Sequence, residues 1–137
     1  MMHDNQISVV LGIIGGFLSY AFGVNEHLEV LLWAITLDII VGVLASFVNE
    51  KLMFNSRKMY KGIVKKVVIL TLVMFAHQLD LMMKTDGIIA KTVTWFFIAN
   101  EGLSVLENAG KCGITLPKIL QSSLEQLKGL TNDNKKR

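Results

Sequence analysis

The chain has 137 residues, of which 52% are hydrophobic, with 14 Lys and Arg against 11 Asp and Glu. This length allows one domain at most. The mean hydropathy is +0.49, and the hydrophobic residues are gathered in blocks, which excludes an ordinary soluble domain. No basic stripe is interleaved with aromatic residues, so no nucleic-acid partner is predicted. A lone cysteine, Cys112, excludes an internal disulfide and offers no metal-ligand cluster.

Four hydrophobic blocks follow one another along the chain. A bilayer core of about 30 Å is crossed by about 20 residues of helix, and a helix satisfies its own backbone in lipid. We therefore predict an all-α integral membrane domain over residues 1–113, with transmembrane helices at about 7–24, 28–48, 65–83 and 88–108. The first block has no Lys or Arg before it and no polar face. These features disfavour a cleaved signal peptide and a helix lying on the membrane surface.

The basic residues indicate how these spans are oriented. Six of them lie between the second and third spans: Lys51, Arg57, Lys58, Lys61, Lys65 and Lys66. Six more follow the fourth span, and only two lie between the third and the fourth. Four spans with both termini in the cytoplasm match the positive-inside rule. If the first block does not cross, three spans remain and the N-terminus lies outside.

The C-terminal part is predicted to lie outside the bilayer. Residues 114–130 are expected to form a short cytoplasmic amphipathic helix, because Pro117 suits a helix start and leucines recur at helical spacing. Residues 131–137 form a polar, basic tail.

Several polar residues lie where lipid would exclude them. An ionisable side chain at the bilayer centre costs about 3 kcal/mol, so it is expected to face protein or water. One intramembrane face, lining a pore or joining copies into an oligomer, is predicted to comprise Asp38, Gly42, Asn100, Glu101, Ser104, Glu107 and Asn108. The alternative for the five residues of the fourth block is an ordinary interfacial helix.

Two smaller features complete the set of candidate residues. Gly12, Gly16, Ser19 and Gly23 form a small-residue stripe on the first span, which is expected to pack helices within one bundle or between subunits. His77 and Asp80 lie near the outer end of the third span, where hydration by interfacial water is expected and a pH-sensing pair is the alternative.

The sequence contains no motif typical of an enzyme. It has no HExxH, GxSxG, P-loop or dinucleotide fingerprint. We predict a protein that is not an enzyme and that needs no cofactor or metal.

Three stretches carry a family resemblance. Residues 100–110 read NEGLSVLENAG and are followed by GITLP at 113–117; residues 37–42 read LDIIVG; and residues 55–66, NSRKMYKGIVKK, form a basic loop. In their order and spacing these stretches resemble the toxin-secretion/phage-lysis holin family over about residues 30–130. Val41 departs from the hydroxyl residue expected at that position.

The resemblance implies a function. Such a holin forms homo-oligomers in the lipid of the host bacterial cytoplasmic membrane and opens lesions. An endolysin, or a large toxin, then crosses without necessarily touching the holin. Two alternatives remain open: a small ion- or proton-coupled transporter that uses Asp38 and Glu101, and a non-conducting anti-holin.

Overall fold

A computed structural model describes residues 2–23, 25–48, 56–120, 122–123 and 126. Four long helices account for most of them: α1 (Met2–Phe22), α2 (Glu26–Val48), α3 (Ser56–Met83) and α4 (Ile88–Lys111). No strand occurs among the residues described. The predicted all-α class is confirmed.

Three helical segments within the described ranges are long and apolar enough to cross a membrane. They are Asn5–Phe22, Glu26–Val48 and Met59–Met83, which confirms the prediction of a membrane protein. Helix α4 has 24 residues but is not one of the three. It carries four charged residues, Lys91, Glu101, Glu107 and Lys111, together with several uncharged polar ones, so its crossing remains a prediction.

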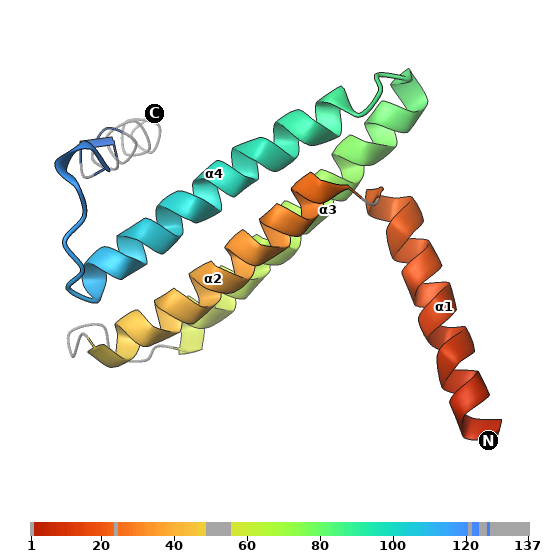
Figure 1. Ribbon diagram of the computed structural model, residues 1–137, viewed down its shortest axis with the longest axis horizontal. Coiled ribbons are helices and arrows are strands. Elements are labelled where there is room, and N and C mark those ends of the chain that lie inside the picture. Colours follow the sequence, from red (N-terminus) through yellow and green to blue (C-terminus); the bar gives the residue numbers. More distant parts are fainter. Residues whose placement is uncertain (1, 24, 49–55, 121, 124–125, 127–137) are drawn as a thin grey trace.

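Helices α2, α3 and α4 form a bundle in which α2 and α4 run in the same direction and α3 runs opposite to both (Figure 1). The core is made by Leu31 and Ile35 of α2 with Ile69 and Val73 of α3. Apolar side chains of α4, among them Phe97, pack against this cluster. The two core positions of α2 are four residues apart, as are those of α3, which places them on one face of each helix.

Helix α1 leaves the bundle at its own C-terminal end (Figure 1). Gly23 ends it with a φ of 61°, a left-handed conformation that suits glycine. The side-chain oxygen of Asn25 then accepts a hydrogen bond from the backbone N–H of Leu28 at 2.8 Å, which caps the start of α2. A Cβ at Gly23 would lie 2.5 Å from the His77 ring of α3, so a side chain at this position would collide with the bundle.

The small-residue stripe of α1 makes no helix contact along most of its length. Around Gly12 and Gly16 no other atom lies within 4 Å of the place that a Cβ would take. The backbone oxygen of Ser19 accepts a hydrogen bond from the Gly23 N–H at 3.0 Å. Gly23 is placed against α3 by its close approach to the His77 ring. Packing of this stripe between copies remains a prediction.

The turn between α3 and α4 is held by Asp80. Its carboxylate accepts hydrogen bonds from the N–H groups of Ile89 (3.0 Å) and Ala90 (2.6 Å) at the start of α4, and from the hydroxyl of Thr85. Asp80 is only 4% exposed. The expectation that interfacial water hydrates it is therefore wrong, because these donors take the place of water.

The chain turns back at the end of α4. Gly113 has a φ of 87°, and the N–H of Ile114 donates to the Ala109 oxygen at 3.2 Å, which closes the last helical turn. Residues 118–120 and 122–123 are helical. The rest of the predicted amphipathic helix, apart from residues 114–117 and 126, and the tail at 131–137 lie outside the described residues.

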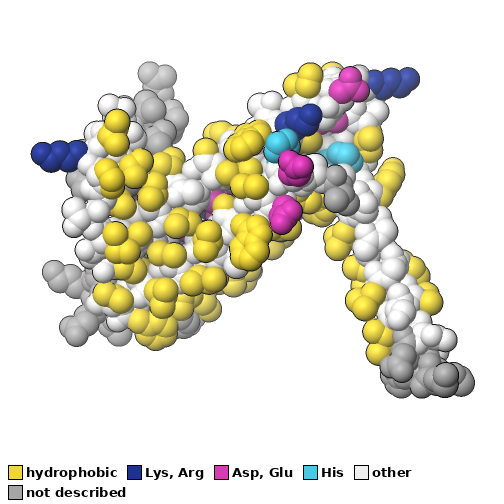
Figure 2. Space-filling model, in the orientation of Figure 1, with side chains coloured by type: hydrophobic (Ala, Val, Ile, Leu, Met, Phe, Trp, Pro, Cys, Tyr) yellow, Lys and Arg dark blue, Asp and Glu magenta, His cyan; other side chains and the backbone are white. Residues whose placement is uncertain are grey.

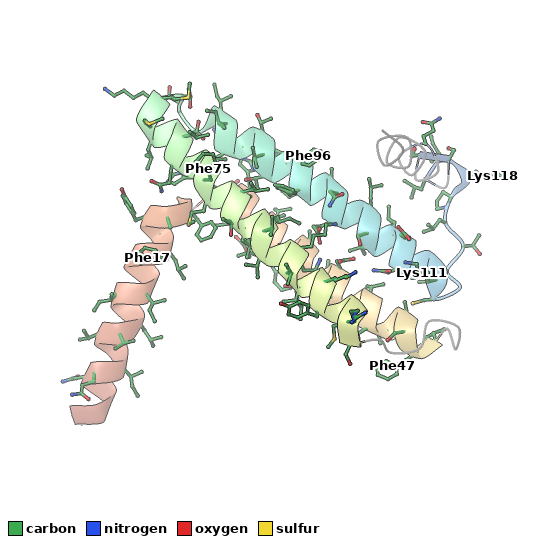
Figure 3. All side chains as sticks on the ribbon, turned by 180° about the vertical axis from the view of Figure 1, so that it is seen from behind. Phe17, Phe47, Phe75, Phe96, Lys111 and Lys118 are labelled. Carbon is green, nitrogen blue, oxygen red and sulfur yellow. The ribbon has the colours of Figure 1, made fainter. Side chains whose placement is uncertain are left out.

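The surface is apolar in the way that lipid requires. Hydrophobic side chains cover the visible face of the bundle and line α1, whereas Asp, Glu and His gather where α1 joins the bundle (Figure 2). Phe17, Phe47, Phe75 and Phe96, which are between 59% and 72% exposed, project outward from the four helices (Figure 3).

Replacing Asp80 tests the helix cap. Asp80→Asn removes the charge and one acceptor from the turn, and should lower the free energy of unfolding by about 1–3 kcal/mol. Asp86→Asn is the matched control, because Asp86 is exposed in the same turn. Its expected effect is within about 0.5 kcal/mol. Denaturant unfolding in detergent micelles, followed by circular dichroism, measures both; equal losses would contradict this role of Asp80.

Candidate functional site

Lys66 of α3 binds two acidic side chains from two other helices. Its Nζ lies 2.7 Å from Oδ2 of Asp38 on α2 and 2.5 Å from Oε2 of Glu101 on α4. Glu101 is 0% exposed and Lys66 is 9% exposed. The three helices of the bundle therefore meet at one buried cation, one buried anion and the partly buried Asp38.

The three charges lie at a common depth. Ten residues separate Asp38 from Val48, Lys66 from Ser56 and Glu101 from Lys111, and these helix ends lie at the same end of the bundle. At 1.5 Å per residue the charges lie about 15 Å inside that end.

Further polar contacts connect the three charges to the nearby end of α4. We call the connected side chains, Asp38, Lys66, Glu101, Glu107, Asn108 and Lys111, the polar network. The other oxygen of Asp38 accepts a hydrogen bond from Nδ2 of Asn108 at 3.1 Å. Nζ of Lys111 in turn lies 3.1 Å from Oδ1 of Asn108 and 3.1 Å from Oε1 of Glu107. Figure 3 marks Lys111 at this end of α4. The polar network thus runs from Glu101 in the bundle to Lys111 at its end.

A glycine makes room for this network. A Cβ at Gly42 of α2 would lie 3.3 Å from Nδ2 of Asn108, tighter than an ordinary contact. Because Gly42 lacks that atom, α4 can bring the Asn108 amide beside Asp38. A side chain at position 42 would require the Asn108 amide to shift by a few tenths of an ångström away from its place beside Asp38.

Two further groups complete the surroundings of Glu101. Nζ of Lys65 lies 3.7 Å from Oε1 of Glu101, with the Lys65 side chain 55% exposed. Nδ2 of Asn100 lies 3.4 Å from the same oxygen. With Lys65, the polar network holds three acids and three lysines. Throughout the described residues, every buried side-chain N or O has a hydrogen-bond partner, as the low dielectric of a bundle requires.

The residues predicted from the sequence are brought together to different degrees. Asp38, Gly42, Asn100, Glu101 and Asn108 meet at the contact between α2, α3 and α4. Glu107 pairs with Lys111 at the partly exposed end, and Ser104 is half-buried on α4 between Glu101 and Asn108. Whether these side chains line a pore or join copies remains a prediction.

The residues of the predicted basic loop differ in their exposure. Arg57 and Lys61 are exposed on the first turns of α3, which begins at Ser56, and Lys65 follows them on the same helix. Lys51 and the side chain of Lys58 lie outside the described residues. Lys66 departs from the predicted loop position, since it is a buried residue of α3.

Lys66 is the residue whose role the sequence reasoning missed. In the structure, the buried positions of α3, namely Ile69, Val73, Ala76 and Asp80, are spaced by three and four. Extending that stripe by three residues toward the N-terminus reaches Lys66. The signal in the sequence was weaker: an acid within each of two spans favours a nearby cation but does not indicate which lysine supplies it.

The chemistry of this site is that of paired charges. Within the part of the chain that the structure describes, no group of His, Cys, Asp and Glu could hold a metal ion. The arrangement joins three largely apolar helices through one polar contact. The contact is stable while its partners stay together, and removing one partner would leave a charge unpaired inside the bundle.

Comparison with known proteins agrees with the resemblance in the sequence. The bacteriophage holin family matches residues 16–129. A protein named a probable holin, from Bacillus phage phi105, is 32% identical over 117 residues, covering 85% of this chain and 84% of its own length. An uncharacterised protein of Listeria innocua is 38% identical over 121 residues, covering 85% and 84%. No solved structure matches this chain.

Replacing Lys66 tests whether it holds the bundle. Lys66→Met leaves two carboxylates without their shared cation, and should lower the free energy of unfolding by about 3–5 kcal/mol. Lys65→Met is the control, because its half-exposed pair with Glu101 should contribute about 1 kcal/mol or less. Denaturant titration in micelles compares the two variants.

A combined variant separates charge pairing from packing. Replacing Asp38 by Asn and Glu101 by Gln in the Lys66→Met background removes the stranded charges, so much of the lost stability should return. No recovery would mean that Lys66 acts through its packing rather than through its charge.

Proposed function

The chain belongs to the bacteriophage holin family, and from that membership and its buried charges we propose that it permeabilises the bacterial cytoplasmic membrane. It does so as a homo-oligomer whose lesions let an endolysin, or a large toxin, pass. The observation that carries the proposal is the contact of Lys66 with Asp38 and Glu101. In this contact the charges are paired with one another inside the bundle, while the outer surface of the bundle is largely apolar.

The closed state corresponds to the monomer. Lys66 neutralises its two acids inside the bundle, and exposed apolar side chains face lipid. Such a molecule can accumulate without opening the membrane, because no buried polar group lacks a partner among the residues described. Accumulation before a sudden opening is what a timed lysis protein needs.

The open state needs the same side chains in water. When copies crowd together, α4 moves away from α2 and α3, and its face from Asn100 to Asn108 turns toward a growing aqueous space. Water then hydrates Glu101, Asp38 and Lys66, in place of the contacts they had with one another. The cost of separating the three helices that this contact joins delays the step until many copies take part.

The membrane potential adds to that delay. Moving one charge through the potential is worth about 2.3 kcal/mol per 100 mV. If opening moves a net charge across the membrane, the potential changes the free energy of opening by this amount for each charge, with a sign set by the direction of movement. An energised membrane can therefore hold the closed state, and loss of potential at the first lesion would release the remaining copies.

The orientation follows from the basic residues. With α1 to α4 all crossing, both termini and the exposed basic start of α3 lie on the cytoplasmic side. The partly exposed end of the polar network at Glu107 and Lys111 then faces the compartment where an endolysin or toxin accumulates. Passage through the lesion requires no contact between that cargo and the holin.

Replacing Glu101 tests the proposal. Glu101→Gln weakens the buried contact with Lys66 that holds the closed state and removes a carboxylate that gains hydration in the lesion, so at equal expression lysis should shift in timing or be abolished. Glu29→Gln is the matched control, because Glu29 is exposed at the other end of the bundle. The measurement is the time from induction to leakage of a large cytoplasmic reporter protein.

Two results would count against the proposal. Unchanged timing in Glu101→Gln would remove Glu101 from the mechanism. If the unaltered chain released no reporter protein but carried a saturable ion flux, it would be a transporter and not a lesion-forming protein.

A further inference from the structure

The first turns of α3 expose a row of basic side chains. Arg57, Lys61 and Lys65 follow one another at intervals of four residues and are all exposed, so they lie on one face of the helix. Asp80 is the only acid between Ser56 and Met83, and it lies near the opposite end of α3. Three basic side chains of α3 therefore lie together on this face.

The same face continues as a row of exposed apolar side chains. Val64, Val68, Leu72 and Phe75 are between 42% and 59% exposed and are spaced by four, four and three residues. The buried stripe of α3, which includes Lys66, Ile69 and Val73, lies on the opposite side of the helix. A ligand on the exposed face would meet cations first and then hydrocarbon.

Lys65 connects this face to the polar network. Its Nζ lies 3.7 Å from Oε1 of the buried Glu101, which is longer than a hydrogen bond, and its side chain is 55% exposed. The ammonium can thus turn to another anion without losing a short contact. Lys66, at 2.5 Å from the same carboxylate, would stay in place.

We propose that Arg57, Lys61 and Lys65 bind the headgroup of an anionic phospholipid, with an acyl chain along Val64, Val68, Leu72 and Phe75. The phosphate accepts charge-assisted hydrogen bonds from the basic side chains. The apolar row favours a lipid over a free phosphate ion, which would use only the cations. Binding draws Lys65 away from Glu101 and weakens the hold on α4, so anionic lipid promotes lesion opening. That last step rests on the proposed function, whereas the lipid site does not.

Lipid retention by the full-length chain tests the site. In native mass spectrometry from nanodiscs, the chain should retain phosphatidylglycerol over phosphatidylcholine with the same acyl chains. Replacing Arg57 and Lys61 by Gln should lower this preference by about fivefold per residue, the equivalent of about 1 kcal/mol each. Lys84→Gln, an exposed lysine at the other end of α3, should leave the preference unchanged.

Three results would overturn the site. They are an equal retention of the two lipids, an equal loss of preference in Lys84→Gln, and displacement of phosphatidylglycerol by inorganic phosphate at matched ionic strength. The last would mean a site for a phosphate ion alone.

Dye release from vesicles tests the coupling. Release caused by the unaltered chain should increase when phosphatidylglycerol is included, and Lys65→Gln should lose that dependence. An equal dependence in Lys65→Gln would overturn the role of Lys65. Vesicles that stay sealed at every composition would contradict the proposed function and the coupling, while lipid retention would still decide the site.

Discussion

Glu101 is wholly buried in a bundle whose surface is apolar, and the ammonium of Lys66 makes that burial tolerable. A carboxylate at this depth would otherwise be neutralised or drawn toward water. Because the same ammonium binds Asp38, a single side chain joins three helices. The packing of α2, α3 and α4 at this depth follows from that one cation.

The bundle is fastened at two levels, and this determines which parts can move. At one end, Asp80 caps the start of α4 and fixes the register of the α3–α4 hairpin. Toward the other end, the polar network fixes α4 against α2. Helix α1 takes part in neither: 6% of its apolar window is buried, against 22% for that of α3. In the proposed lesion, the contacts that must change are those of the polar network, while the Asp80 turn can remain a hinge.

Much of this could be predicted from the sequence, for physical reasons that also explain what could not. Lipid admits long apolar helices and makes a charge within them costly, and both features can be read directly from the sequence. The all-α membrane class, Asp38 and Glu101 could therefore be recognised without a structure. The partner of those acids could not, because which lysine faces inward depends on the rotation of α3. Lys66 follows Lys65 directly, but a helix turns by about 100° per residue. Lys66 is therefore buried between the two acids, whereas the Lys65 side chain is half-exposed. Burial of Asp80 likewise depends on where the next helix begins.

The accessibility of Ser104 to water tests the central claim most directly. Ser104 lies half-buried on α4 between Glu101 and Asn108, and Ser104→Cys in a Cys112→Ser background provides a single thiol. A membrane-impermeant thiol reagent should leave it unlabelled while cells stay intact, and should label it when the large reporter begins to leak. Labelling of intact cells, or protection that persists after leakage, would contradict a closed polar network that opens to water.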